Sequence, residues 1–210
     1  MSFKCYKHFH ASVKFIGHFC LLIFSITVAS EVLADTLKLK LWEKKRGDAE
    51  IPVELILPEA PIKTPVPLVV LQHGSVRDAG KVFGSIVETD EHQRRLAEAA
   101  LAEGFAVAIV DAFHGTKIKS HQKTEFPDAH EYARSIANYL ASDTRLDADN
   151  FFYSGFSYGG RSVLLLMGDL YFGDGKQWAG LVAAEPGCAT FHEARDFGVP
   201  LLTIKGADSH

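Results

Sequence analysis

The sequence predicts an α/β protein with an open, mostly parallel central sheet and helices on both of its faces. From residue 36 onward, short apolar runs alternate with stretches whose apolar residues have helical spacing. A glycine-flanked serine at position 157 also stands directly between one apolar run and the next helical stretch. Parallel strands need a crossover about as long as a helix, so this alternation favours a parallel sheet.

Residues 1–34 are expected to form a secretory signal peptide, which lies outside the fold. Lysines at positions 4, 7 and 14 begin it, an apolar run covers 15–29, and Val32-Leu33-Ala34 offers small residues for cleavage before Asp35. The apolar run is too short for a comfortable membrane span, and a retained N-terminal anchor is the alternative. We therefore expect an exported chain, periplasmic or secreted, without membrane contact after cleavage.

The remaining residues, 35–210, are expected to form one domain, because the chain has only 210 residues. Their single cysteine, Cys188, cannot form an internal disulfide, so export does not imply a disulfide scaffold here. The net charge of −4 gives no argument for a nucleic-acid partner.

The first strands of this domain are expected to form an antiparallel hairpin at one edge of the sheet. Residues 36–42 and 51–57 alternate apolar and polar side chains, and a charged turn containing Gly47 joins them. A proline-rich loop over 58–67 follows. The continuous apolar run at 68–71 is typical of a strand that is buried on both faces of a parallel sheet.

Helices and strands then alternate to the end of the sequence. Apolar spacing predicts a helix over 90–103, which Gly104 ends. The predicted elements after it are a strand at 105–110, a helix at 128–140 with Tyr132, Ile136, Tyr139 and Leu140 on one side, a strand at 151–153, a helix at 161–167, a loop at 168–176, and strands at 181–184 and 201–204.

Residues with useful chemistry follow five of the predicted strands. In open α/β sheets, ligands bind beyond the carboxyl ends of the strands, where such residues gather at one edge. The groups placed there are His73-Gly74-Ser75, Asp111, Ser157, Glu185 to Cys188, and Asp208.

The segment Gly155-Phe156-Ser157-Tyr158-Gly159-Gly160 has the pattern of a nucleophile elbow, a sharp strand-to-helix turn that exposes a serine. Positions two residues either side of the serine must lack a Cβ so that the strand and helix can approach each other. The turn places the hydroxyl at the N-terminal end of a helix, where backbone N–H groups can stabilise an oxyanion. The alternative is a glycine-rich turn whose serine only caps the helix.

Acyl transfer by a serine requires a nucleophile, a base, an acid that orients the base, and two oxyanion donors. We assign Ser157 as the nucleophile and the backbone N–H groups of Tyr158 and Ser75 as the donors. His73 is expected to brace the loop by hydrogen bonding instead of acting as the base. The acid is expected to be Asp208, after the last predicted strand, with Glu185 as its rival.

The sequence has no suitable histidine at the position where the catalytic base is expected. In this arrangement the histidine follows the acid along the chain, and only His210 follows Asp208. Two residues cannot carry an imidazole ring around to face both partners. We therefore expect the fold to be incomplete at the C-terminus, lacking a last strand and helix, with the histidine beyond residue 210.

These motifs give a family resemblance. The chain resembles the dienelactone hydrolase family of α/β-hydrolases over residues 45–210. The matching features are Val69-Val70-Leu71-Gln72-His73-Gly74, Asp111 followed by Phe113-His114-Gly115, the elbow within 147–160, and Glu185-Pro186-Gly187-Cys188 before Pro200-Leu201-Leu202.

The resemblance implies a single-domain hydrolase of esters or lactones that needs no cofactor, with Ser157 and Asp208 matching two triad members. Three departures matter, and the missing histidine described above is one of them. The founding enzymes use a cysteine nucleophile, so dienelactone itself is not the expected substrate. Family members usually have two residues between the glycine and the acid, whereas Gly206-Ala207-Asp208 has one.

The expected function is that of an exported serine hydrolase that cleaves carboxylic ester or lactone bonds through an acyl-enzyme on Ser157. The expected partner is a small-molecule ester or lactone. Phe113, Tyr158, Cys188 and Phe191 are candidates for an apolar pocket rim. The alternative is a truncated or non-catalytic homologue that lacks the triad histidine.

Overall fold

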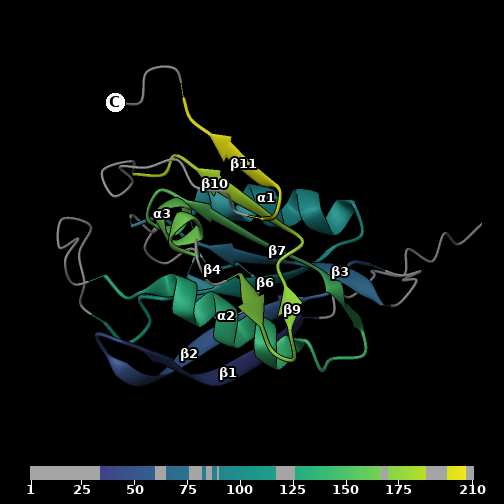
Figure 1. The fold of residues 1–210 in the computed structure, drawn as a ribbon, viewed down its shortest axis with the longest axis horizontal. Coiled ribbons are helices and arrows are strands. Elements are labelled where there is room, and N and C mark those ends of the chain that lie inside the picture. The colour runs from purple at the N-terminus through teal and green to yellow at the C-terminus, as the bar shows by residue number, and fades with distance from the viewer. Residues whose placement is uncertain are drawn as a thin grey trace, which may run out of the picture.

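The computed structural model describes residues 34–59, 65–75, 82–83, 87–88, 90–116, 126–166, 170–187 and 198–206. Strands and helices alternate along most of this chain (Figure 1). The elements are β1 (Ala34–Glu43), β2 (Gly47–Ile56), β3 (Val66–Gln72), β4 (Val82–Phe83), β5 (Val87–Glu88), α1 (Glu91–Ala102), β6 (Ala106–Val110), α2 (Ala129–Leu140), β7 (Leu146–Phe156), α3 (Tyr158–Leu165), β8 (Tyr171–Phe172), β9 (Lys176–Gln177), β10 (Gly180–Ala184) and β11 (Leu201–Ile204).

Seven of these strands form the central sheet, in the order β1-β2-β6-β3-β7-β10-β11. The pairs β1·β2 and β2·β6 are antiparallel, and the pairs from β6 through to β11 are parallel. The prediction of a mostly parallel sheet with antiparallel N-terminal edge strands is therefore confirmed.

The edge hairpin β1–β2 follows from alternation in its sequence. Leu39 and Leu41 are buried, whereas Lys40 and Trp42 between and after them are exposed. A strand turns successive side chains to opposite faces, so one face of β1 packs on the core and the other meets solvent. Lys40 pairs with Asp48 across the hairpin at 3.1 Å.

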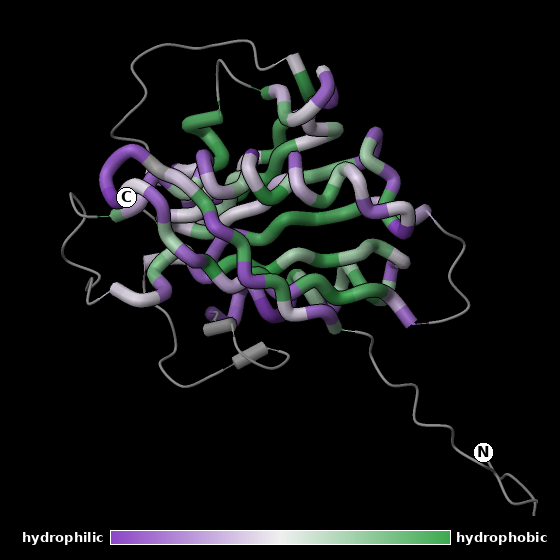
Figure 2. The backbone as a smooth tube through the Cα atoms, turned by 90° about the horizontal axis from the view of Figure 1, so that it is seen from below, coloured by the Kyte–Doolittle hydropathy of each residue, from purple (hydrophilic) through white to green (hydrophobic). Residues whose placement is uncertain are grey.

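The central strands are covered on both faces. All five residues of β6 are buried, and neighbouring residues of β3 point to opposite sides, with Val70 in one apolar cluster and Leu71 in another. Helix α1 contributes Ala97 to the smaller cluster, while α2 and α3 pack into the larger one on the other face (Figure 1). The most hydrophobic strands accordingly run through the middle of the fold (Figure 2). Helices on both faces are thus confirmed.

After β3, the chain adds its next two strands on opposite sides of β3. The candidate site lies at this point of the sheet. The chain leaves β3, passes through α1 and adds β6 on one side, then passes through α2 and adds β7 on the other side. Gln72 at the end of β3 lies opposite Gly155 near the end of β7. In open α/β sheets, the crevice at such a switch point is where ligands bind.

Two details of the sequence prediction are wrong. Tyr139 is 54% exposed and does not share the buried side of α2 with Tyr132, Ile136 and Leu140. It stands at the margin of the apolar stripe, where helical spacing alone does not decide burial. The segment predicted as a loop over 168–176 contains strand β8 and the start of β9, which pair in a short antiparallel hairpin.

Among the residues that the structure describes, no helix is both long and apolar enough to cross a lipid bilayer.

Candidate active site

Ser157 occupies the turn between β7 and α3 with a strained backbone. Its φ of 52° and ψ of −105° lie where a residue with a Cβ is rarely found. Two hydrogen bonds hold the turn in place: the Ser157 N–H donates to the Ala184 carbonyl at 2.8 Å, and the Arg161 N–H donates to the Ser157 carbonyl at 2.9 Å. The serine is therefore fixed between the end of β10 and the first turn of α3.

The glycines of the elbow are required because backbone atoms from neighbouring segments occupy the space of a Cβ. A Cβ on Gly155 would lie 2.2 Å from the carbonyl carbon of Gly159, and one on Gly160 would lie 2.6 Å from the Ala184 oxygen. A Cβ on Gly159 would lie 2.3 Å from the Gln72 oxygen. The predicted spacing of glycines around the serine thus corresponds to real close approaches of strand, turn and helix.

A cavity of about 110 Å³ opens at the elbow. Its lining includes Gly187, from the predicted group Glu185 to Cys188, and it brings together the three residues that were assigned catalytic roles, namely Ser75, Ser157 and Tyr158. They come from two neighbouring strand ends and the start of α3, as expected for a site at the switch point. Tyr158 is the first residue of α3, so helix geometry directs its amide toward the N-terminal end of that helix. The catalytic roles of the three residues stay predictions.

His73 braces the loop that carries Ser75. The imidazole is fully buried, and its Nε2 accepts a hydrogen bond from the Ala112 N–H at 3.1 Å. Nε2 must therefore be unprotonated, which puts the proton on Nδ1, 2.6 Å from the Gly74 carbonyl to which it donates. Both ring nitrogens are engaged, so His73 has the bracing geometry predicted from the sequence.

Asp90 holds the same loop from the other side. Its carboxylate caps α1, accepting from the Gln93 N–H at 2.8 Å, and it also accepts from the Gly74 N–H at 2.6 Å. The Gly74 amide is thereby occupied. The amide of Ser75, the next residue, has no acceptor among the described residues, which fits its assignment as an oxyanion donor.

A cluster of aromatic rings packs around Tyr158, the residue that follows Ser157. The Tyr158 ring lies 5.1 Å from the rings of Phe113 and Phe126, and its hydroxyl donates to the Pro127 carbonyl at 2.7 Å. Phe126 lines the cavity at Ser157, whereas Phe113 is buried behind these two rings. The expectation that Phe113 forms the pocket rim is therefore wrong, because Phe126 and Tyr158 cover it.

The structure describes only some of the residues that were predicted to complete the triad or to line the pocket. Asp208, Cys188 and Phe191 lie outside the described residues. Glu185, the rival acid, directly follows β10 with a φ of 47°. Its carboxylate accepts a hydrogen bond from the Gly206 N–H, and its own N–H donates to the Ile204 carbonyl at 2.7 Å. Glu185 thus links the ends of β10 and β11 and does not line the described cavity at Ser157.

His130 is the second residue of α2, and the charge of Arg161, which lines the cavity, acts on it. Burial holds the pKa of its imidazole below the ordinary value of 6.5, and the charges of Arg134 and Arg161 act in the same direction. Asp128 and Glu131 oppose them. Its Nδ1 is buried and has no hydrogen-bond partner among the described residues. The environment of His130 therefore favours the neutral ring.

The lowered pKa of His130 predicts a loss of stability in mild acid. As the pH falls below about 6.5, the unfolded chain takes up a proton that the folded chain resists, so the free energy of unfolding decreases. We expect His130→Gln to reduce this decrease between pH 7.5 and pH 5.5, as measured by urea unfolding at both pH values. An unchanged pH dependence in the variant would show that other groups cause it.

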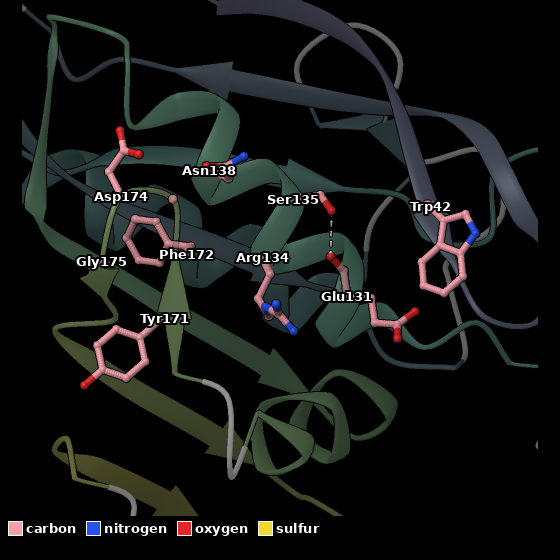
Figure 3. Close-up of a pocket in the computed structure, with 10 residues that line it drawn as sticks. Trp42, Glu131, Arg134, Ser135, Asn138, Tyr171, Phe172, Asp174 and Gly175 are labelled. Carbon is pink, nitrogen blue, oxygen red and sulfur yellow. Dashed lines mark hydrogen bonds between the residues drawn. The ribbon is translucent and has the colours of Figure 1, made fainter.

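A larger hollow of about 520 Å³ lies along α2 and shares no lining residue with the cavity at Ser157. Trp42 stands at one side of it and Tyr171 at the other, with Arg134 and Asn138 between them (Figure 3). Its one serine, Ser135, donates its hydroxyl to the Glu131 carbonyl at 3.0 Å (Figure 3). This hydroxyl sits in a regular helix and lacks the strained backbone of Ser157. The elbow is the better candidate for a reactive site.

Two residues at the site carried no site signal in the sequence. Phe126 lines the cavity, and Asp90 fixes the loop beside it. Asp90 could have been recognised only as the cap of α1, because its second contact crosses to a loop 16 residues away. Arg161 also lines the cavity; its position one helical turn after Ser157 is a signal that the sequence did offer.

No protein-family model matches the sequence, and no curated protein matches it. Among solved structures, the fold is similar to a dienelactone hydrolase from Klebsiella pneumoniae, at 16% identity and a TM-score of 0.58, over 82% of this chain and 71% of that one. It is also similar to a dienelactone hydrolase-like promiscuous phosphotriesterase from metagenomic libraries, at 14% identity and a TM-score of 0.57, over 84% and 70% of the two chains. The chain therefore has the α/β-hydrolase fold, in the form seen in dienelactone hydrolase-like structures.

Proposed function

We propose that the protein is a serine hydrolase that cleaves carboxylic ester or lactone bonds. The observation that carries the proposal is the strained backbone of Ser157, whose φ of 52° is maintained by close glycine contacts at the mouth of a cavity. Strain of this kind costs free energy and persists where the surrounding structure enforces it, as at reactive sites. A serine needed only as a helix cap would require no such turn, and Ser157 makes no side-chain cap bond to α3.

In the proposed reaction, the Ser157 hydroxyl attacks the carbonyl carbon of the substrate and loses its proton to a histidine base. The negative charge on the carbonyl oxygen is stabilised by the N–H groups of Tyr158 and Ser75. The alcohol leaves with a proton from the histidine, and water then releases the acid from the acyl-serine. Asp208 is proposed to orient the histidine.

We also propose that the protein is exported; N-terminal sequencing of the mature protein tests this.

Hydrolysis of p-nitrophenyl acetate and butyrate by the full-length protein tests the proposed function. We expect turnover with an initial burst, and a loss of about 10³-fold or more in kcat for Ser157→Ala. Ser135→Ala, in the hollow along α2, is the matched control and should retain wild-type turnover. Equal turnover by the wild type and Ser157→Ala would contradict the proposal.

A further inference from the structure

We propose that Lys45, in the turn of the edge hairpin β1–β2, sets the size of the acyl group that the site accepts, because it fixes Phe126 in the wall of the cavity at Ser157. This inference rests on the proposed function and adds a residue that determines specificity from a distance. Lys45 does not line the described cavity. It acts through Phe126, so it is a positioning residue.

Phe126 bounds the space that an acyl group would occupy. It lines the cavity together with Ser157 and is only 5% exposed. Its ring packs against the rings of Phe113 and Tyr158, each with its centroid 5.1 Å away. An acyl group bonded to the Ser157 oxygen would lie in the cavity that both residues line. The position of the Phe126 ring therefore limits the length of the acyl chain.

Lys45 holds the backbone at Phe126, although it comes from a part of the chain 81 residues earlier. Its ammonium group donates to the Phe126 carbonyl at 2.6 Å and lies 3.4 Å from the Asp128 carboxylate. Hydrogen bonds from a charged donor are stronger than those between neutral groups. The backbone N–H of Lys44 also donates to the Glu131 carboxylate at 3.0 Å. The hairpin turn thus anchors both the wall residue and the first turn of α2.

Arg46, the next residue of the turn, holds the ring behind Phe126. Its guanidinium donates to the Ala112 carbonyl at 2.9 Å and to the His114 carbonyl at 3.1 Å. These two carbonyls flank Phe113, against which the Phe126 ring packs. The turn therefore fixes both the backbone of Phe126 and the ring that supports it.

The cavity is small enough for the wall to matter. A volume of about 110 Å³ holds roughly four groups the size of a water molecule. A butyryl group is close to this limit, whereas an octanoyl group exceeds it. Release of Phe126 from Lys45 would let the ring move away from Ser157 and make room for the longer chain.

Esters of one alcohol with two acyl lengths test this inference on the full-length protein. The wild type should hydrolyse p-nitrophenyl butyrate with a kcat/KM about 10- to 100-fold above that of the octanoate. Lys45→Met keeps the length of the side chain but loses the donor, and should narrow this ratio by about 10-fold. Lys45→Arg should retain the wild-type ratio. Lys44→Met is the matched control, because its contact to Glu131 uses the backbone N–H, and it should leave the ratio unchanged.

A double-mutant cycle tests whether Lys45 acts through Phe126. Phe126→Ala removes the ring and should narrow the ratio at least as much as Lys45→Met does. In the double variant, Lys45→Met should change the ratio by no more than about 2-fold further, because the ring on which it acts is gone. Effects that simply multiply, equal losses for both esters in Lys45→Met, or an unchanged ratio would each overturn the inference.

Hydrogen–deuterium exchange separates this inference from the proposed function. In Lys45→Met, the peptide 126–132 should exchange faster than in the wild type, whereas the peptide 151–156 in β7 should not change. Wild-type exchange and a wild-type ratio in an active variant would overturn the inference and leave the function standing. Faster exchange in a protein that hydrolyses neither ester would support the contact of Lys45 with Phe126 and overturn the function.

Discussion

Gly159→Ala is expected to destabilise the protein by about 3 kcal/mol, because the new methyl group would collide with backbone atoms that cannot move independently. The Cβ would lie 2.3 Å from the Gln72 oxygen and 2.9 Å from the His73 oxygen. Gln72 belongs to β3, which is paired on both sides within the sheet. Relief of the collision therefore requires α3 to shift away from β3, which would also displace Ser157.

Urea unfolding of the purified variant measures this effect. Gly187→Ala is the matched control, because a Cβ there meets no atom of the described residues within 4 Å. This substitution is expected to change stability by less than about 0.5 kcal/mol. Gly187 lines the cavity at Ser157, so this control also lies at the site, where a new methyl group has space. A Gly159→Ala protein as stable as the wild type would show that α3 and β3 are not in close contact.

Asp90→Ala is expected to cost stability and catalysis together. The carboxylate is only 8% exposed and accepts the N–H groups of both Gly74 and Gln93. Loss of the helix cap costs about 1 kcal/mol, and leaving the buried Gly74 N–H unsatisfied costs about 1–3 kcal/mol more. Without this anchor, the loop that presents the Ser75 amide is no longer fixed beside Ser157.

We therefore expect kcat to fall about 10- to 100-fold in Asp90→Ala while KM changes little, since an oxyanion donor acts mainly in the transition state. Asp90→Asn keeps one acceptor oxygen and should give an intermediate result. Glu91→Ala, one residue further along α1, removes exposed ion pairs to Arg94 and Arg95 and should leave kcat unchanged. A normal kcat in folded Asp90→Ala would contradict the bracing role.

The sequence was sufficient to predict a mostly parallel sheet with an antiparallel edge and a tight turn at Ser157, because burial on both faces and glycine spacing are local properties. The apolar run 68–71 became part of β3, and the spacing of Gly155, Ser157 and Gly159 became a strained turn. Contacts between distant segments were harder to predict. The bonds from Asp90 to Gly74 and from His73 to Ala112 exist only once β3, α1 and β6 are side by side.

The mistakes about single side chains have the same origin. Phe113 follows a strand and looked like a rim residue, but Phe126, from a later part of the chain, helps to cover it. Tyr139 has the spacing of a buried residue, yet it lies at the edge of the buried face of α2 and is largely exposed. In both cases, burial depends on a neighbour whose position the local pattern does not encode.

Reaction of the full-length protein with a fluorophosphonate, followed by peptide mass spectrometry, tests the central claim most directly. If the turn at residue 157 presents an activated hydroxyl to the cavity, the label should be found on that serine, and prior incubation with a slowly hydrolysed ester should reduce it. A folded protein that stays unmodified at this position, or that carries the label on another serine, would contradict the account.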